Sequence, residues 1–256
     1  MISLKDKVIW LTGASSGIGE ALAFELGRRG AILALSARNR EALERISSDL
    51  TKSGARVLVA PCDVLDIEQT KATANLVTKT LGTIDIVIAN AGTHIFSVPE
   101  KFDSAEYLGL MQLNYGGLLH TIESVVPAMI ARRGGYIVGV ASMAGYRALP
   151  RAAAYGASKA AAIHFLESLR FHLAEHGIAV SIVNPGFVKT PLTDKNDFRM
   201  PFLIDAREAA ATICDGMERQ KLEIAFPSVF KWIMKISQLL PDFIYRPIVR
   251  SIWKSM

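Results

Sequence analysis

Two residues near the middle of the chain have the types and the spacing for proton transfer. Tyr155 and Lys159 lie four positions apart in the run YGASK, so on a helix both side chains would point to the same side. A phenol has a pKa of about 10 and must become more acidic to exchange protons near neutral pH, which a neighbouring ammonium group favours. Taken alone, the pair could equally be two exposed residues of an ordinary helix.

Two further polar residues precede this pair. Ser142 ends the segment GGYIVGVAS, and Asn114 lies in QLNYGG within an expected helix. A lone serine or asparagine in such a place is ordinarily a helix cap or a buried hydrogen-bonding residue. Their meaning therefore depends on the elements that position them.

Six short apolar runs alternate with longer helical patterns along the chain. They are VIWLTG, AILALSAR, RVLVAPCDV, IDIVIANAG, GGYIVGVAS and IAVSIVNPG. Apolar runs of this length are typical of strands in a parallel sheet that helices cover on both faces. The pattern predicts an α/β fold with a doubly wound, Rossmann-like parallel sheet in three αβα layers. Ligands bind beyond the carboxyl ends of such strands, so functional residues are expected there.

The first expected strand is followed by the glycine-rich turn TGASSGIG, which opens a helix. Gly13, Gly17 and Gly19 allow a tight turn and a close approach of the backbone to a phosphate, and the helix N-terminus presents free amides. The spacing is wider than in the GxGxxG fingerprint, and glycine turns also occur without a ligand. The strand before and the helix after favour a phosphate-binding turn.

The end of the second expected strand indicates which dinucleotide binds. An acidic residue here, about 20 positions beyond the glycine turn, would bind the ribose hydroxyl of NAD. This chain has Ala37 and Arg38 instead. Arginine pairs with phosphate through a planar fork of donors, so Arg38 predicts NADP(H). The alternative is an ordinary exposed residue at the start of a helix.

The third and fourth expected strands end in further candidates. Asp63 is placed to accept a hydrogen bond from the adenine amino group, and Asn90, Ala91 and Gly92 would let the backbone approach a flat ligand. Each segment could also be a simple turn. Cys62 is expected to be buried rather than nucleophilic, because free cysteine is commonly buried and no basic residue adjoins it.

The ordered set of motifs resembles one known family. The set comprises TGASSGIG, NAG, a mid-helix asparagine, a serine at a strand end, YGASK and PGFVKT. In this order and spacing the motifs are similar to the short-chain dehydrogenase/reductase family of the NADP-preferring type. The resemblance covers the chain from about residue 5 to residue 190, and it implies an oxidoreductase.

The resemblance implies a role for each polar residue. Tyr155 is expected to be the general acid in carbonyl reduction and the base in the reverse direction. Lys159 would lower the pKa of the phenol and hold the nicotinamide ribose. Ser142 would hydrogen-bond and polarise the substrate carbonyl, and Asn114 would hold a water that links the lysine to solvent.

The expected cofactor contacts follow the strand ends and the matching motifs. They are Gly13, Ser15, Gly17, Ile18, Gly19, Arg38, Asp63, Val64, Asn90, Ala91, Gly92, Tyr155, Lys159, Pro185, Gly186, Val188 and Thr190. The loop over the substrate is expected at about residues 190–203. Beside the site lie Met143, Ala144, Tyr146 and Phe187, which indicate an apolar substrate, although core packing explains them as well.

The five histidines need no role in this scheme. Histidine is the side chain that most readily changes charge near neutral pH, which makes it a frequent catalytic base. The resemblance assigns it no such task here. We expect His94 to line the pocket, and His120, His164, His172 and His176 to pack or to lie at the surface.

The function expected is an NADP(H)-dependent oxidoreductase that interconverts a ketone and a secondary alcohol, with reduction of a hydrophobic or lipid-like carbonyl compound favoured. One alternative is a dehydrogenase that oxidises a small polyol or sugar alcohol. Another is a dinucleotide-binding sensor or scaffold without turnover. A homo-oligomer, dimer or tetramer, is expected from the resemblance, and small residues at 160–162 would allow close helix packing.

Length and composition fit a single globular domain. The chain has 256 residues, of which 50% are hydrophobic and 21% charged. No apolar run reaches the roughly 18 residues of a membrane span, and no signal peptide is evident at the N-terminus. Cys62 and Cys214, the only cysteines, lack metal-ligand spacing and cannot form a disulfide framework. A reducing, cytoplasmic setting without a metal site is expected.

The net charge of +5 is concentrated at the C-terminus. Residues 228–256 carry five basic residues and one acid, a net +4, which leaves +1 for residues 1–227. Without a basic groove or a known nucleic-acid-binding module, nucleic-acid binding is not expected. Residues 1–227 are expected to form the catalytic domain, and residues 228–256 a helical extension that is not an independent domain.

The extension departs from the family pattern. Pro241 and Pro247 should break it into short helices, in which polar stripes separate wide apolar faces. The stripes consist of Lys231, Lys235 and Gln238, and of Arg246, Arg250 and Lys254. Such faces suit peripheral contact with a membrane surface. Packing as a lid over the substrate loop, or at an oligomer interface, is expected equally.

Overall fold

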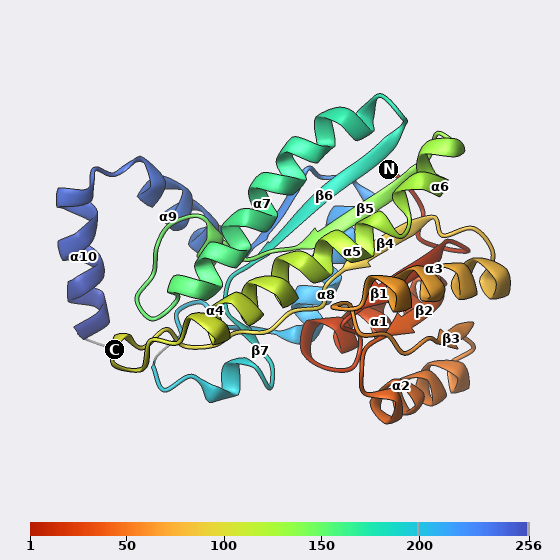
Figure 1. Ribbon diagram of the computed structural model, residues 1–256, viewed down its shortest axis with the longest axis horizontal. Helices are drawn as coiled ribbons and strands as arrows, with labels where there is room; N and C mark the ends of the chain where they lie inside the picture. The colour runs from red at the N-terminus through yellow and green to blue at the C-terminus, as the bar shows by residue number, and fades with distance from the viewer. Residues whose placement is uncertain (199, 255–256) are drawn as a thin grey trace.

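A seven-stranded parallel sheet organises the fold (Figure 1). The computed structural model describes residues 1–198 and 200–254, without the side chains of residues 99, 195 and 252–254. The strand order is β3-β2-β1-β4-β5-β6-β9. The strands are β1 Val8–Thr12, β2 Ile32–Ser36, β3 Val57–Val59, β4 Ile86–Ala89, β5 Gly135–Val140, β6 Ile178–Pro185 and β9 Glu223–Phe226. The expected doubly wound α/β sheet is confirmed, and β9 is added to the six predicted strands.

Helices cover both faces of the sheet. On one face lie α1 Gly17–Arg28, α2 Arg40–Lys52 and α8 Ala206–Glu218. The other face carries α3 Ile67–Leu81, α5 Gly117–Glu123, α6 Val126–Ala131 and α7 Ala153–Ala174. Successive strand residues point into opposite layers: Ile9 and Leu11 into the first, Val8 and Trp10 into the second. Burial on both sides explains why the strands are continuous apolar runs.

The N-terminus of α1 differs from those of the neighbouring helices. Asn39 and Asp66 cap α2 and α3 with side chains that accept backbone N–H bonds. Ser16, the N-cap of α1, makes no such hydrogen bond within the described chain. The first amides of α1 therefore remain available to a ligand.

The helix that carries Asn114 is irregular. It begins as α4 Ser104–Met111, passes through a π-helical turn at Gln112–Gly116, and continues as α5. Such π turns are rare and often occur at functional sites. Smaller elements are the β7 Val188–Lys189 and β8 Ile204–Asp205 pair, and the short turns η1 Pro99–Lys101, η3 Met143–Gly145 and η4 Thr193–Lys195.

Two helices form the C-terminal extension, α9 Ser228–Leu239 and α10 Asp242–Lys254. In Figure 1 they stand at the left, beyond the end of the sheet. Pro241 separates them as predicted, whereas the prediction that Pro247 breaks the chain is wrong, because it lies inside α10. The carbonyl that loses its partner belongs to Phe243, a residue that is 78% exposed, so water can replace the bond. Within the described chain, no helix is long and apolar enough to span a membrane.

Candidate active site

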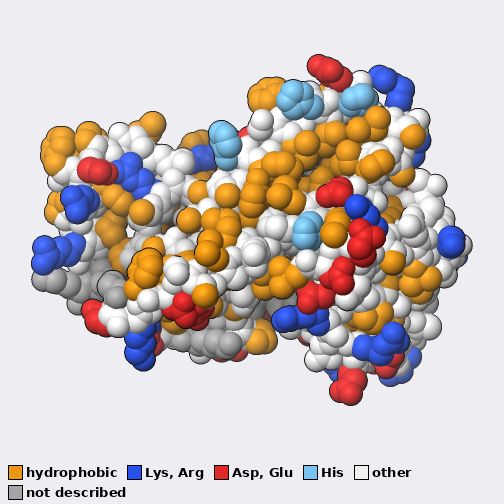
Figure 2. Space-filling model, viewed as in Figure 1, with side chains coloured by type: hydrophobic (Ala, Val, Ile, Leu, Met, Phe, Trp, Pro, Cys, Tyr) orange, Lys and Arg blue, Asp and Glu red, His pale blue; other side chains and the backbone are white. Residues whose placement is uncertain are grey.

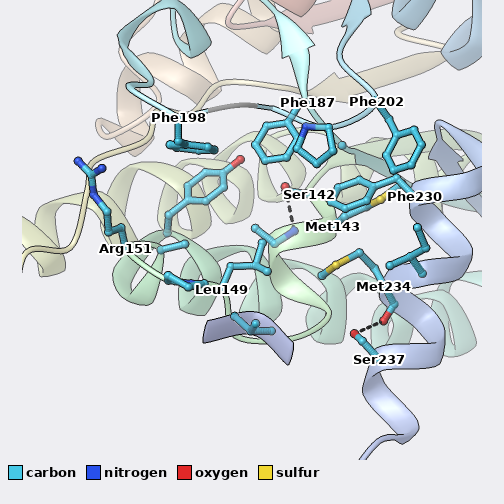
Figure 3. A pocket seen from close by; sticks show the side chains of 18 of the residues that line it. Ser142, Met143, Leu149, Arg151, Phe187, Phe198, Phe202, Phe230, Met234 and Ser237 are labelled. Atoms are coloured by element: carbon cyan, nitrogen blue, oxygen red, sulfur yellow. Dashed lines mark hydrogen bonds between the residues drawn. The ribbon is translucent and has the colours of Figure 1, made fainter. Parts of the chain in front are cut away.

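Two cavities at the carboxyl end of the sheet meet at Ser142 and Tyr155, which line both. The first, of about 560 Å³, extends along the glycine turn. The second, of about 620 Å³, extends toward the C-terminal helices (Figure 3). The two hydroxyl groups therefore lie where a molecule in one cavity would face a molecule in the other.

The first cavity, called here the nucleotide cavity, is lined by every residue that the sequence predicts for cofactor contact. Most of these residues follow the carboxyl ends of β1, β2, β3, β4 and β6, which the parallel topology brings to one edge, whereas Tyr155 and Lys159 come from α7. Sequence reasoning missed several neighbours, whose only signal is adjacency to the motifs: Ser16, Asn39, Cys62, Thr93 and Leu113.

The glycine turn is held tightly against the sheet. Gly13 has a φ of +65°, and a Cβ on Gly19 would lie 2.0 Å from the Gly13 carbonyl oxygen. The Asn90 side chain clamps the turn, since its Nδ2 donates to the carbonyl oxygens of Thr12 at 3.1 Å and Gly13 at 3.0 Å. Only glycine permits this approach, which leaves room for a phosphate at the start of α1.

At the far end of the nucleotide cavity, the residues that follow β2 include an arginine and no acidic residue. Arg38 is exposed and lines the cavity beside Ala37. Asp63 also lines it, and its Oδ1 accepts the backbone N–H of Leu65 at 3.0 Å. Free helix amides, a glycine cradle and an arginine fit a phosphate-rich dinucleotide.

Tyr155 and Lys159 share one side of α7, as predicted. Lys159 is 5% exposed, and its Nζ lies 5.8 Å from the Tyr155 ring centroid while donating to the Val140 carbonyl at 3.0 Å. Burial lowers the pKa of Lys159 to about 8. Burial also raises the pKa of Tyr155, against a smaller lowering by a hydrogen bond with Ser142. The group that opposes the effect of burial on the Tyr155 pKa is therefore Ser142, and not Lys159 as expected.

Ser142 and Asn114 are both buried and hydrogen-bonded. Ser142 Oγ accepts the Ala144 backbone N–H at 3.1 Å and so caps the turn η3. Asn114 accepts the Thr93 N–H at 2.8 Å and donates to the Thr93 carbonyl at 2.9 Å and to Ser158 Oγ at 3.0 Å. Ser142 thus caps a turn and also lines the site, and Asn114 is a buried hydrogen-bonding residue, which are the structural roles expected of such residues taken alone.

The second cavity, called here the apolar cavity, is lined mainly by aromatic and aliphatic side chains. Phe187 stacks on Phe230 with ring centroids 5.7 Å apart, and Phe198 meets Phe187 edge-on (Figure 3). At the rim, the Arg151 guanidinium lies 4.1 Å from the Phe96 ring centroid. The lining comes from the segments after β4, β5 and β6, from the 190–203 loop and from the two C-terminal helices, so the extension completes this cavity.

Of the four flanking residues named from the sequence, three line the apolar cavity: Met143, Ala144 and Phe187. Tyr146 does not, because its hydroxyl donates a 2.5 Å hydrogen bond to Glu223 on β9. Burial and this bond raise the pKa of the Tyr146 phenol. The packing alternative therefore holds for Tyr146.

His94 lines the apolar cavity, with its ring edge-on to Tyr155 at a centroid distance of 4.8 Å. Burial, helped by the charge of Arg151, lowers the pKa of His94, so the imidazole is neutral at pH 7. His120 bonds the Val64 carbonyl through Nδ1, and His164 and His172 are exposed. Across the described residues, no three His, Cys, Asp or Glu side chains are grouped to hold a metal ion.

Fold and site together are typical of oxidoreductases that bind a nicotinamide dinucleotide at the carboxyl edge of a Rossmann-like sheet. The chain belongs to the short-chain dehydrogenase/reductase family. A family model described as short chain dehydrogenase matches residues 7–199. That range includes the glycine turn and all four polar residues of the site.

Relatives agree with this membership. An uncharacterized oxidoreductase of Myxococcus xanthus is 32% identical over 252 residues, which cover 98% of this chain and all of the relative. The actinorhodin polyketide ketoreductase, solved with NADPH, has a TM-score of 0.78 at 26% identity, covering 88% of this chain and 97% of its own. A family member from Burkholderia phymatum, solved with NAD, shares the fold with a TM-score of 0.87 at 23% identity, covering 96% and 97% of the two chains.

Proposed function

We propose that the protein is an NADP(H)-dependent reductase that converts a ketone on an apolar substrate to a secondary alcohol. The observation that carries the proposal is the meeting of the two cavities at Ser142 and Tyr155. A carbonyl group at this junction would face two hydroxyl groups, with the nucleotide cavity behind it. The apolar body of the substrate would occupy the apolar cavity.

Each polar residue then has a defined task. When bound, the nicotinamide supplies a hydride to the carbonyl carbon. Tyr155 donates its proton to the carbonyl oxygen, and Ser142 donates a hydrogen bond that fixes this oxygen and stabilises its developing charge. Lys159 provides positive charge near the phenolate that forms and holds the ribose. Asn114 positions a water that relays the proton back from solvent.

The protonation states support the reductive direction. Burial raises the pKa of Tyr155, so the phenol keeps its proton at neutral pH and can act as an acid. The pKa of Lys159, lowered by burial to about 8, leaves most of the ammonium charged at pH 7. Reduction is expected to slow as the pH rises above about 8, where this charge is lost.

The preference for NADP(H) rests on Arg38. This residue is exposed at the wall of the nucleotide cavity, where the 2′-phosphate of NADP(H) would lie. The NADPH complex of the ketoreductase relative is consistent with such a site. In Arg38→Ala, the KM for NADPH should rise about tenfold or more, with little change for NADH. A wild-type preference for NADH would contradict the proposal.

The apolar lining supports a hydrophobic substrate. Hydroxyl groups of a polyol or sugar alcohol would lie against Phe187, Phe198 and Phe230 without hydrogen-bond partners, which is costly. A panel of short ketones, 3-oxoacyl thioesters and steroids, followed by NADPH absorbance, tests this. We expect kcat/KM to rise with the apolar surface of the ketone. NADPH binding without turnover on any of them would favour a silent sensor.

Tyr155→Phe is the direct test of the chemistry. Removal of the phenolic hydroxyl should lower kcat by about a hundredfold or more, because the proposed proton donor is then missing. NADPH binding and the fold should remain. Tyr115→Phe is a matched control, since Tyr115 packs on Phe165 outside both cavities. Retained turnover in Tyr155→Phe would refute the assignment.

We also propose that residues 1–227 act as the catalytic domain, that residues 228–256 complete its substrate cavity, and that copies associate as a dimer or tetramer. Phe171 on α7 and Leu108 on α4 are 75% and 64% exposed. Figure 2 shows a band of hydrophobic side chains over α7. Sedimentation equilibrium of wild type and Phe171→Ser tests the association, and a monomeric wild type would contradict it.

A further inference from the structure

Helix α9 presents three different faces. Phe230, Met234 and Ser237 turn toward the apolar cavity, and Met234 and Ser237 are buried. The second face is polar and also points toward the body of the protein. Lys235 and Lys231 form ion pairs with Glu223 at 2.6 and 3.5 Å.

The polar face holds α9 in place. Burial acts to raise the pKa of Glu223, but hydrogen bonds from Lys235 and Tyr146 lower it, so the carboxylate is charged at neutral pH. Gln238 Nε2 donates to the Tyr146 carbonyl at 3.0 Å. The polar stripe predicted for α9 therefore forms its ion pairs and hydrogen bonds with the body of the protein.

The third face of α9 is apolar and open. An amphipathic helix on a globular protein ordinarily turns its polar residues to water. Here the cations point inward, and the outward face carries large apolar side chains between 48% and 83% exposed: Val229, Trp232, Ile233, Ile236 and Leu239. Such an exposed apolar face is typical of a surface that binds an apolar partner.

Helix α10 also exposes apolar side chains and adds positive charge. Phe243 and Ile248 are 78% and 45% exposed, and Arg246 and Arg250 are exposed beside them. The single acid of the extension, Asp242, is paired with Arg147 at 2.6 Å. Lys254, predicted for the same stripe, lies outside the described side chains. Among the described residues, no acidic group forms an ion pair with Arg246 or Arg250. Apolar side chains flanked by such arginines complement an anionic lipid surface.

The apolar cavity opens on the same surface. Ile233, Ile236 and Ile248 line the cavity and are at the same time 48%, 57% and 45% exposed. An apolar compound dissolved in a bilayer could therefore pass between these residues without crossing water. The C-terminal extension thus places an apolar opening and basic groups on one side of the molecule.

We propose that the outward face of α9 and α10, defined by Val229, Trp232, Ile236, Leu239 and Phe243 with Arg246 and Arg250, docks on an anionic membrane surface. A second copy of the chain fits less well. A two-fold contact through this face would bring the arginines of both copies into one interface, while Asp242 is already paired. The docking does not depend on the proposed reaction.

Vesicle sedimentation of the full chain tests the docking. We expect wild type to pellet with vesicles of phosphatidylcholine and phosphatidylserine, and less with phosphatidylcholine alone. Trp232→Ser combined with Leu239→Ser should weaken binding about tenfold or more, because two exposed apolar side chains outside the cavity no longer insert. Leu76→Ser on α3, 46% exposed, is the matched control and should bind as wild type.

A second variant separates charge from insertion. Arg246→Gln with Arg250→Gln should reduce the preference for phosphatidylserine and the sensitivity of binding to salt. Circular dichroism and NADPH binding report whether each variant folds. Absence of wild-type binding to anionic vesicles, or equal binding by Trp232→Ser/Leu239→Ser, would overturn the proposal. So would a wild-type dimer that the same double variant dissociates, since a second copy would then cover the face.

Discussion

Replacing Lys159 with methionine is expected to stabilise the cofactor-free protein while abolishing turnover. Lys159 is 5% exposed, and its ammonium donates to the Val140 carbonyl, with no carboxylate among its described partners. Burial lowers its pKa from 10.5 to about 8. At about 1.4 kcal/mol per pKa unit, the charged lysine lowers the free energy of unfolding by about 3 kcal/mol. The unpartnered Val140 carbonyl offsets about 1 kcal/mol, so a gain of about 2 kcal/mol is expected at pH 7.

The pH dependence gives the sharper test of this reasoning. Between about pH 8 and 10.5 the unfolded chain holds the Lys159 proton and the folded protein does not. The unfolding free energy of wild type should therefore rise with pH across this window. Below about pH 8 the destabilisation by the buried, charged Lys159 is fully present. Denaturant unfolding at several pH values measures the unfolding free energies of wild type and Lys159→Met. The difference between the two should shrink toward high pH.

A surface lysine provides the control for Lys159→Met. Lys79, exposed on α3, can be replaced by methionine without removing a buried charge, so stability should be nearly unchanged at every pH. If Lys159→Met were less stable than wild type at pH 7, the buried ammonium would not be a source of instability. A difference from wild type that stays constant with pH would refute the same reasoning.

Two further substitutions test the positioning of the site. Gly19→Ala should abolish dinucleotide binding, because its Cβ would lie 2.0 Å from the Gly13 carbonyl oxygen, whereas Gly109→Ala, with no atom within 4 Å, should bind normally in a fluorescence titration. Asn114→Ala should lower the free energy of unfolding by about 2–5 kcal/mol and reduce kcat, because three hydrogen bonds are lost, two of them to Thr93. A loss below about 0.5 kcal/mol in denaturant unfolding would show that the Asn114 bonds are not needed for stability.

The sheet could be predicted because strands buried on both faces must be apolar throughout. The edge strand β9 was missed because it is short and lacks such a continuous apolar run. It has only four residues, begins with the partly exposed Glu223, and pairs with β6 some forty positions earlier. Short edge strands owe their existence to pairing with distant segments, which leaves little local signal.

At Pro247 and Tyr146, predictions from the local sequence alone differ from the structure. Proline in a helix removes one hydrogen bond, but the affected carbonyl in α10 belongs to an exposed residue and can bond water, so the helix persists. Tyr146 lies close in sequence to Ser142, but its hydroxyl turns to Glu223 on another strand. Proximity in sequence to a site does not determine where a side chain points.

The sequence by itself determined six of the seven strands, the glycine turn and most of the residues that line the nucleotide cavity. Parallel topology makes that inference sound, because motifs that follow successive strands must meet at one edge of the sheet. Only the tertiary structure decided the shape of the substrate cavity and the orientation of the C-terminal extension. The stripe of Lys231 and Lys235 predicts an amphipathic helix, but it cannot say which face meets the protein. Glu223, brought alongside by the pairing of β9 with β6, turns those lysines inward and leaves the apolar face of α9 outside.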